Sequence, residues 1–269
     1  MNAETATWHY GLIARYWNEF NVAEPAELAW YRAAIERHGQ PALDAGCGTG
    51  RLLLPLLRAG LEVDGVDVSE DMLRLCAERA RAEGLAPRLV AQPLHRLELD
   101  RRYRTVYLCG VFGIGGSRAD DLEGLHGIHR ALAPGGALMI EHELPYAGLD
   151  EERWARWLPG RRGDLPRPWP AAAERRRAAD GDELELISRL AEFDPLALRH
   201  ELELRVRLWR DGAVVEEEAP RRLVENLYFV PEIELMLRTA GFTEVEVTRR
   251  WSDEPAGPDD AGVMLVAIA

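Results

Sequence analysis

Three glycines alternate with other residues directly after an acidic side chain. The run Asp44-Ala-Gly-Cys-Gly-Thr-Gly50 places them at positions 46, 48 and 50. Glycine adopts positive φ and has no Cβ, so a ligand can approach the main chain closely at such a turn. The apolar residues before Asp44 predict a short buried strand, and Arg51–Arg58 predicts a helix. The spacing therefore predicts a cofactor site at a strand, turn and helix unit.

A second acidic residue, Asp67, ends the next predicted strand over 61–67. A carboxylate at that place can accept hydrogen bonds from both hydroxyls of a ribose. The dinucleotide fingerprint would need Gly or Ala at the sixth position of the glycine motif, which is Arg51 here. A cofactor that contains a ribose is expected, and a nicotinamide dinucleotide fits this loop less well.

Acid–base chemistry is suggested by the run Glu141-His142-Glu143 at the end of a predicted strand over 137–142. A neutral His can take up a proton near pH 7, and a neighbouring carboxylate can orient its ring. His142 is therefore the candidate general base, with Glu141 as its partner. The alternative is a polar strand end at which His142 makes one structural hydrogen bond.

No metal site is expected. The three cysteines, at 47, 76 and 109, have none of the spacings that bind zinc or form a redox pair. Buried reduced thiols are the simpler interpretation of these residues.

Predicted strands alternate with helices in the first half of the chain. After the strand at 41–43 come strands over 61–67, 88–91, 103–109 and 137–142. This alternation predicts an α/β fold with a parallel sheet. An aromatic-rich segment before it, 8–38, is expected to form two helices that are separated at Pro25.

The second half has a different pattern. Strands are predicted over 184–193 and 199–208, and Arg210-Asp211-Gly212 forms the turn of a hairpin. A helix over 232–239 and strands over 245–248 and 263–268 close the chain. Four parts follow: an N-terminal helical cap (1–40), a cofactor-binding α/β core (41–143), an inserted lid with antiparallel strands on the substrate side (144–225), and a closing helix and β-hairpin (226–269).

These motifs together resemble the class I S-adenosylmethionine-dependent methyltransferases, of the small-molecule type. The resemblance is carried by Asp44–Gly50, by Asp67 and by the Pro134-Gly-Gly136 turn ahead of the fifth strand. It implies a doubly wound, seven-stranded, mainly parallel sheet of the Rossmann-like methyltransferase fold, with an antiparallel inserted sheet. It also implies S-adenosyl-L-methionine as cofactor and S-adenosyl-L-homocysteine as product.

The resemblance further assigns residues to the cofactor. Tyr16 would fold over it from the N-terminal helix, and Gln92 stands where the family commonly has an Asp that binds the adenine amino group. The full set of expected cofactor contacts is Tyr16, Asp44, Ala45, Gly46, Cys47, Gly48, Gly50, Asp67, Val68, Met72, Gln92, Pro93, Leu94, Cys109 and Gly110.

Charge and composition limit the partners. The formal net charge of −13 disfavours a nucleic-acid partner, since phosphate binding relies on basic surface. No stretch approaches a membrane span, and the N-terminus has no signal-peptide pattern. Every basic residue in the Lys and Arg count is Arg, which is typical of a GC-rich bacterial genome. A bacterial, cytoplasmic protein is expected.

The function predicted is in-line transfer of a methyl group to oxygen or nitrogen of a small molecule, a natural product or a metabolite. Two alternatives stay open at this stage: an NAD(P)-dependent oxidoreductase and a non-catalytic cofactor-binding protein. The inserted sheet is expected either to cover the substrate or to form a homodimer.

Overall fold

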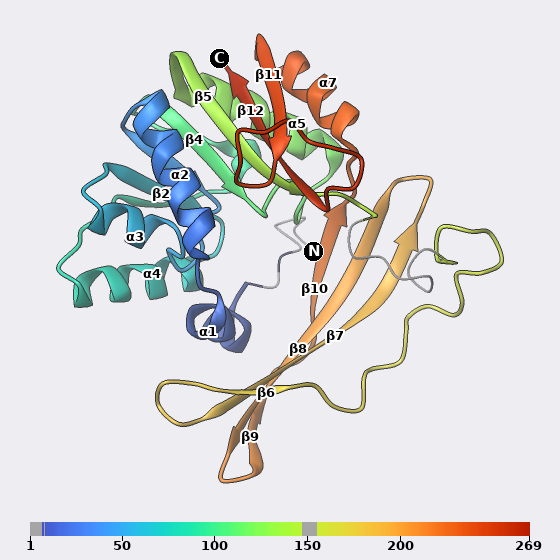
Figure 1. The fold of residues 1–269 in the computed structure, drawn as a ribbon. Coiled ribbons are helices and arrows are strands. Elements are labelled where there is room, and N and C mark those ends of the chain that lie inside the picture. Colours follow the sequence, from blue (N-terminus) through green and yellow to red (C-terminus); the bar gives the residue numbers. More distant parts are fainter. Residues whose placement is uncertain (1–6, 8, 147–154) are drawn as a thin grey trace. The chain divides into compact units, whose positions relative to one another are not determined.

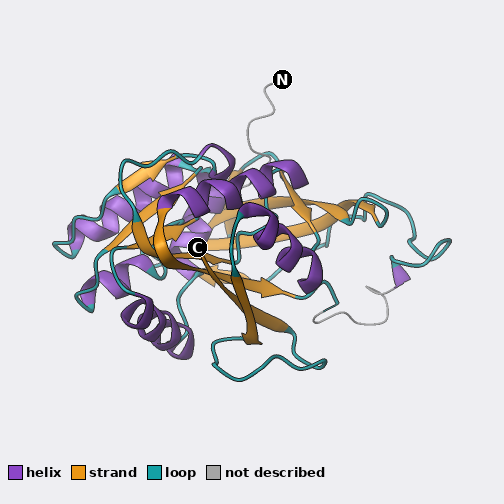
Figure 2. Cartoon of the chain, turned by 90° about the horizontal axis from the view of Figure 1, so that it is seen from above, coloured by secondary structure: helices purple, strands orange, loops and turns teal. Residues whose placement is uncertain are grey.

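The computed structural model describes residues 7, 9–146 and 155–269, which form two compact units. We call the described residues of Val22–Gly113, Ser117–Gly148 and Tyr228–Ala269 the core unit. The described residues of Met1–Asn21, Ile114–Gly116 and Leu149–Leu227 are the antiparallel unit. Trp154, an aromatic of the expected lid, lies outside the described residues. Figure 1 labels the elements of both units, and Figure 2 separates helices from strands by colour.

The core unit contains a seven-stranded sheet in the order β11-β12-β5-β4-β1-β2-β3. The five strands from β3 to β5 in this order are parallel, whereas β12 is antiparallel to both of its neighbours. This arrangement confirms the expected fold class. The strands are β1 (Ala42–Ala45), β2 (Val63–Asp67), β3 (Leu89–Ala91), β4 (Tyr103–Cys109), β5 (Leu132–Glu143), β11 (Glu244–Arg249) and β12 (Gly262–Ile268).

Two apolar clusters of the core unit lie on opposite faces of this sheet. One packs the sheet against the helices α2 (Pro25–His38), α3 (Leu53–Arg58) and α4 (Glu70–Ala82). The other packs it against the 3-10 turn η1 (Leu94–Arg96) and the helices α5 (Arg118–Ala131) and α7 (Val230–Ala240). Residues along β5 alternate between the clusters, because successive strand side chains point to opposite faces. Ala137 and Met139 belong to the first cluster, and Leu138 and Ile140 to the second.

Local signals set several helix starts. Ser69 is the N-cap of α4, and its Oγ accepts a hydrogen bond from the main-chain N–H of Met72 at 3.2 Å. Pro25 stands at the start of α2, so the N-terminal segment divides there into two helices as expected. These signals fix where each helix leaves the carboxyl edge of the sheet.

The antiparallel unit is a second sheet covered by one helix. Its strand order is β10-β8-β7-β6, and β9 pairs with β8. The helix α1 (Gly11–Phe20) packs Leu12 and Ile13 into the apolar face of this sheet. The strands are β6 (Arg175–Arg177), β7 (Glu183–Asp194), β8 (Arg199–Arg210), β9 (Ala213–Glu217) and β10 (Arg221–Asn226).

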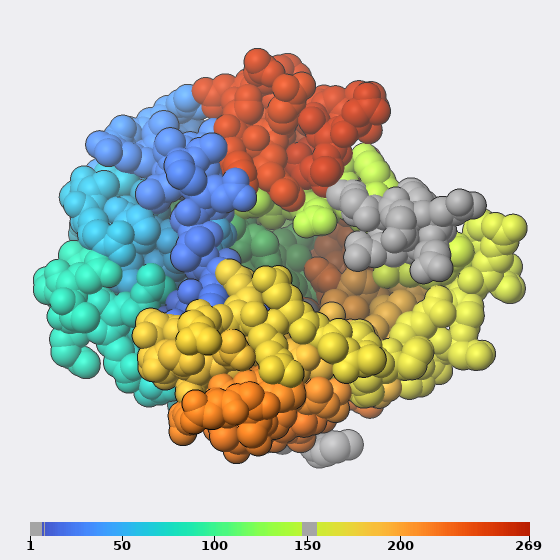
Figure 3. All heavy atoms as spheres, turned by 60° about the horizontal axis from the view of Figure 1, so that its bottom comes forward, coloured from blue at the N-terminus to red at the C-terminus, as the bar shows by residue number. Residues whose placement is uncertain are grey.

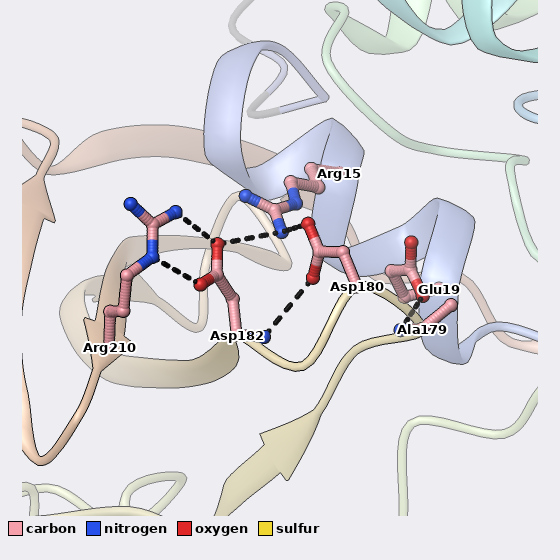
Figure 4. A network of polar contacts seen from close by, with 6 residues as sticks. All are labelled: Arg15, Glu19, Ala179, Asp180, Asp182 and Arg210. Atoms are coloured by element: carbon pink, nitrogen blue, oxygen red, sulfur yellow. Dashed lines mark hydrogen bonds and ion pairs between the residues drawn. The ribbon is translucent and has the colours of Figure 1, made fainter.

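Ion pairs connect α1 to this sheet (Figure 4). Arg15 lies 2.7 Å from a carboxylate oxygen of Asp180 and 3.3 Å from one of Asp182, and Arg210 binds both oxygens of Asp182. The Glu19 side chain accepts a hydrogen bond from the main-chain N–H of Ala179. The segment expected as one helical cap, 1–40, thus contributes α1 to the antiparallel unit and α2 to the core unit.

Two features differ from the expectations. The strands β6 and β10 were not expected. The fifth strand begins at Leu132 instead of 137, and the expected Pro134-Gly-Gly136 turn lies inside it as an irregularity. There Tyr103 pairs with Leu132, and Thr105 with Ala137, so extra residues of β5 loop out of the ladder.

None of the helices among the described residues has the length and apolar composition that crossing a bilayer requires.

Candidate cofactor site

The glycine loop follows β1 at the carboxyl edge of the core sheet, and its three glycines have different surroundings. All three have positive φ, at 89°, 52° and 82° for Gly46, Gly48 and Gly50. A Cβ at Gly46 would lie 2.8 Å from Val111, and one at Gly50 would lie 2.7 Å from Cys76. At Gly48 no described atom would lie within 4 Å. The loop is therefore packed at both ends and presents open main chain in the middle, where a ligand can approach.

Asp67 lies beside this open position. Its Oδ2 accepts a hydrogen bond from the Gly48 main-chain N–H at 2.8 Å, and its Oδ1 accepts one from the N–H of Ser69 at 2.8 Å. Burial raises the pKa of Asp67, and the main-chain donors of Ser69, Gly48 and Val68 oppose that rise. The structure thus brings two sequence-predicted residues together and anchors the carboxylate at the end of β2.

Asp44 is buried between the neighbouring strands, opposite Gly65 on β2 and Tyr107 on β4. Burial raises the pKa of its carboxyl group from 3.8 to about 7, although the Tyr107 hydroxyl and the Arg51 guanidinium act in the opposite direction. A carboxyl group that titrates near neutral pH loses its proton when a cation is placed beside it. Asp44 is the residue of the glycine loop that is best suited to this change of charge.

The residues expected near an adenine follow β2 and β3. Val68 is half-buried, and Met72 is buried on the first turn of α4. Pro93 and Leu94 are half-buried. Leu94 also packs against the apolar cluster that includes residues of α5. The Gln92 amide forms a reciprocal pair with the main chain of Glu98, at 3.0 and 3.2 Å. Gln92 therefore has a structural partner in this loop, and its adenine contact stays a prediction.

The carboxyl end of β4 holds a polar cluster. The Cys109 thiol donates to Glu141 at 2.9 Å and lies 3.3 Å from the Glu27 carboxylate, while Arg51 donates to the Cys109 sulfur at 2.8 Å. Arg51 also forms an ion pair with Glu27. Burial is the main cause that raises the pKa of Cys109, and the adjacent Glu141 adds to it, so the thiol is neutral. Gly110 follows with positive φ and open space around it.

Sequence reasoning missed Glu27 and Arg51 as members of this site. The Arg51 guanidinium contacts two of the three groups, Glu27, Cys109 and Glu141, whose donor atoms converge within 4.8 Å in the described chain. The cluster therefore already contains a cation. The available signal was Arg51 itself, which stands where a dinucleotide site would need a small residue.

The expected acid–base pair is not formed. Glu141 shares the face of β5 with Met139 and lies 3.4 Å from both Tyr31 Oη and Arg250 Nε. His142 points to the other face, where its Nε2 lies 2.8 Å from the main-chain oxygen of Tyr228. Neighbouring residues of a strand project to opposite faces, so Glu141 and the ring of His142 point away from each other. A catalytic role for either residue stays a prediction. The alternative of a structural hydrogen bond at His142 is what the structure has.

Tyr16, expected to cover the cofactor, is a half-buried residue of α1 in the antiparallel unit. Its ring packs against Phe20, with 4.9 Å between ring centroids, and against the apolar face of that sheet. The structure gives Tyr16 this packing role, and its cofactor contact stays a prediction.

Comparisons with known proteins agree with this geometry. Residues 42–136 match the family model described as a methyltransferase domain. A Geobacillus sp. (strain WCH70) protein that carries the name of a methyltransferase is 24% identical over 261 residues, which cover 94% of this chain and 96% of that protein. Matches to five other curated methyltransferases span between 27% and 53% of their lengths.

Solved structures share the fold over nearly the whole chain. A S-adenosylmethionine-dependent methyltransferase from Clostridium acetobutylicum superposes with a TM-score of 0.71 at 16% identity, covering 96% of this chain and 97% of that one. CalS10 from Micromonospora echinaspora, an amino pentose methyltransferase solved with bound S-adenosylmethionine, gives a TM-score of 0.64 at 19% identity, with coverage of 97% and 98%.

Proposed function

Because this chain is a class I S-adenosylmethionine-dependent methyltransferase, we propose that it methylates oxygen or nitrogen of a small molecule, a metabolite or a natural product. The strand order supports transfer chemistry over the oxidoreductase alternative, since a dinucleotide fold continues with parallel strands where β12 is antiparallel. The amino pentose activity in the name of CalS10 is one example of such an acceptor in this fold.

The observation that carries the cofactor side of the proposal is the pairing of Gly48 with Asp67. Open main chain at Gly48 and a carboxylate 2.8 Å from its N–H fit a nucleoside that must approach closely and bind through its ribose hydroxyls. The proposed contact set also includes Asp44, Ala45, Gly46, Cys47, Gly50, Val68, Met72, Pro93, Leu94, Cys109 and Gly110, with Tyr16 and Gln92 as further predicted contacts. When bound, S-adenosylmethionine supplies an electrophilic methyl group on a sulfonium.

The protein's own contribution is orientation and exclusion of water. No side-chain nucleophile is needed, and a base is needed only for a hydroxyl or a protonated amine. His142 is not proposed as that base, because its ring is bonded to the Tyr228 main chain. The insertion at 144–225 is proposed to contact the acceptor. The all-arginine basic composition supports a bacterial origin, and a cytoplasmic location is part of the same proposal.

Parallel calorimetric titrations with S-adenosylhomocysteine, S-adenosylmethionine and NADH test the proposal. We expect micromolar binding of the first two ligands and none of NADH. A panel of hydroxyl-bearing and amine-bearing small molecules is then incubated with methyl-labelled cofactor. Transfer to a panel member supports the function, binding of NADH alone contradicts it, and cofactor binding without transfer across a broad panel favours the non-catalytic alternative.

A further inference from the structure

Arg51 connects three elements at the carboxyl edge of the core sheet. It follows Gly50 directly, just before α3, and its guanidinium donates to Cys109 Sγ at the end of β4 at 2.8 Å. The same guanidinium forms an ion pair with Glu27 on α2. The arginine thus links the end of the glycine loop both to the residue before Gly110 and to a helix that precedes the sheet.

Glu27 has little freedom to respond if this link is removed. Its side chain is 2% exposed, and it also accepts a hydrogen bond from the Glu24 main-chain N–H at 3.1 Å as part of a capping box. A buried carboxylate that loses its cation is strongly disfavoured, so the helix or the loop would have to move. Arg51 is the cation with which it forms an ion pair in the described part of the chain, and the planar guanidinium reaches Glu27 and Cys109 together.

The Arg51 guanidinium is held by groups of the protein itself. Both terminal nitrogens already have protein partners, NH1 with Glu27 and NH2 with Cys109. These two contacts let Arg51 act on a cofactor through the segments that it holds, which are the end of the glycine loop and the start of the loop after β4.

We propose that Arg51 is a positioning residue for S-adenosylmethionine. By holding Glu27 and Cys109, it keeps the glycine loop and the Cys109–Gly110 segment at a fixed spacing to which the cofactor binds. This inference rests on the cofactor contacts proposed above for Gly48 and Gly110. A lysine at position 51 would keep the charge for Glu27 but could not bridge both partners.

The test measures S-adenosylhomocysteine affinity by calorimetry for Arg51→Met, Arg51→Lys, Glu27→Gln and the Glu27→Gln/Arg51→Met double variant. We expect Arg51→Met to weaken binding about tenfold or more, and Arg51→Lys to recover part of that loss. The double variant is expected to lose less than the product of the two single losses, because both changes break the same link. Arg58→Met, which removes an exposed ion pair with Glu83 at the end of α3, is the matched control and should bind like the wild type.

Urea unfolding of each variant separates a loss of stability from a loss of affinity. The proposal is overturned if Arg51→Met is folded and binds S-adenosylhomocysteine within about twofold of the wild type. It is also overturned if the affinity loss of the double variant equals the product of the two single losses. If Arg51→Met does not fold, Arg51→Lys and Glu27→Gln decide in the same way. A wild-type protein that binds no S-adenosylhomocysteine contradicts the cofactor contacts themselves, a result distinct from failure of the positioning role.

Discussion

Asp67 illustrates how one side chain can serve the loop and the ligand. It holds the Gly48 N–H in the open middle of the glycine loop, and it ends the strand next to β1. Its second oxygen caps the turn into α4 through Ser69. Both oxygens keep further lone pairs for ribose hydroxyls. The residue therefore contributes both to the shape of the loop and to the proposed binding of the cofactor.

Replacing Asp67 with Ala should weaken S-adenosylhomocysteine binding by on the order of 1.5–3 kcal/mol, which is about tenfold to a hundredfold in Kd, because charged hydrogen bonds are lost. Calorimetry measures the change. Asp64→Asn is the control: Asp64 lies on the same strand, but it binds Tyr103 Oη and Arg101. That variant should keep the affinity and lose only stability. Wild-type affinity in Asp67→Ala would remove the ribose assignment.

Asp44 predicts a pH dependence. Its pKa is about 7 when folded against 3.8 ordinarily, so the folded state retains a proton that the unfolded state releases. The contribution of this group to stability is present below about pH 4 and is lost as the pH rises through 7. A bound ligand that carries an ammonium group favours the carboxylate, so binding should release a proton.

The affinity for S-adenosylhomocysteine should consequently rise between about pH 6 and 8, by at most about tenfold per pH unit. Titrations in two buffers of different ionisation enthalpy count the proton released near pH 6.5. Asp44→Asn should bind more weakly and show neither effect. A wild-type affinity that is constant across this range would contradict the placement of the ligand's cation beside Asp44.

At the scale of elements, strand ends were predictable, and contacts between distant elements were not. The strand β4 has the predicted bounds. The strands β2 and β3 end at the predicted residues, and β1 ends two residues later than predicted. These ends were predictable because short apolar runs stop at Gly, Pro or acidic residues. The site at Asp44, Gly48 and Asp67 follows from those ends. Glu27 could not be foreseen, because its place depends on how α2 packs on the sheet. The strands β6 and β10 are short and charged, which gives no clear periodicity.

The role of His142 on β5, structural or catalytic, can be tested by substitution. The structure makes its ring a partner of the Tyr228 main chain, on the face of β5 opposite Glu141. His142→Gln keeps a donor for that carbonyl, so we expect turnover on the identified acceptor within about twofold of the wild type and a stability loss of about 1 kcal/mol. Initial rates and urea unfolding measure both. A rate loss of about a hundredfold at unchanged stability would restore His142 as a base.

At the scale of the whole molecule, the net charge and the exposed sheet edges indicate which partners the protein can bind. The formal charge of −13 disfavours a nucleic-acid acceptor and also any contact between copies of the chain. Among the described strands β9 pairs with β8 alone, and Val214 and Val215 on it are 42% and 50% exposed. The hairpin of β8 and β9 lies at the surface, as the orange atoms in Figure 3 show. An exposed apolar strand edge of this kind is suited to pairing with a second copy.

We propose that a homodimer, if the inserted sheet forms one, pairs through β9, and salt provides the test. Glu216 is exposed on the same strand and the formal net charge is −13, so two copies repel each other at low ionic strength. Sedimentation velocity should show a dimer fraction that increases between about 0.05 and 0.5 M NaCl, as screening shortens the reach of that repulsion. Val215→Asp should abolish the dimer, whereas Leu235→Asp, at an exposed apolar site on α7 in the core unit, should not. A monomer at every salt concentration would leave covering the acceptor as the role of the sheet, and a dimer that weakens with salt would place the interface elsewhere.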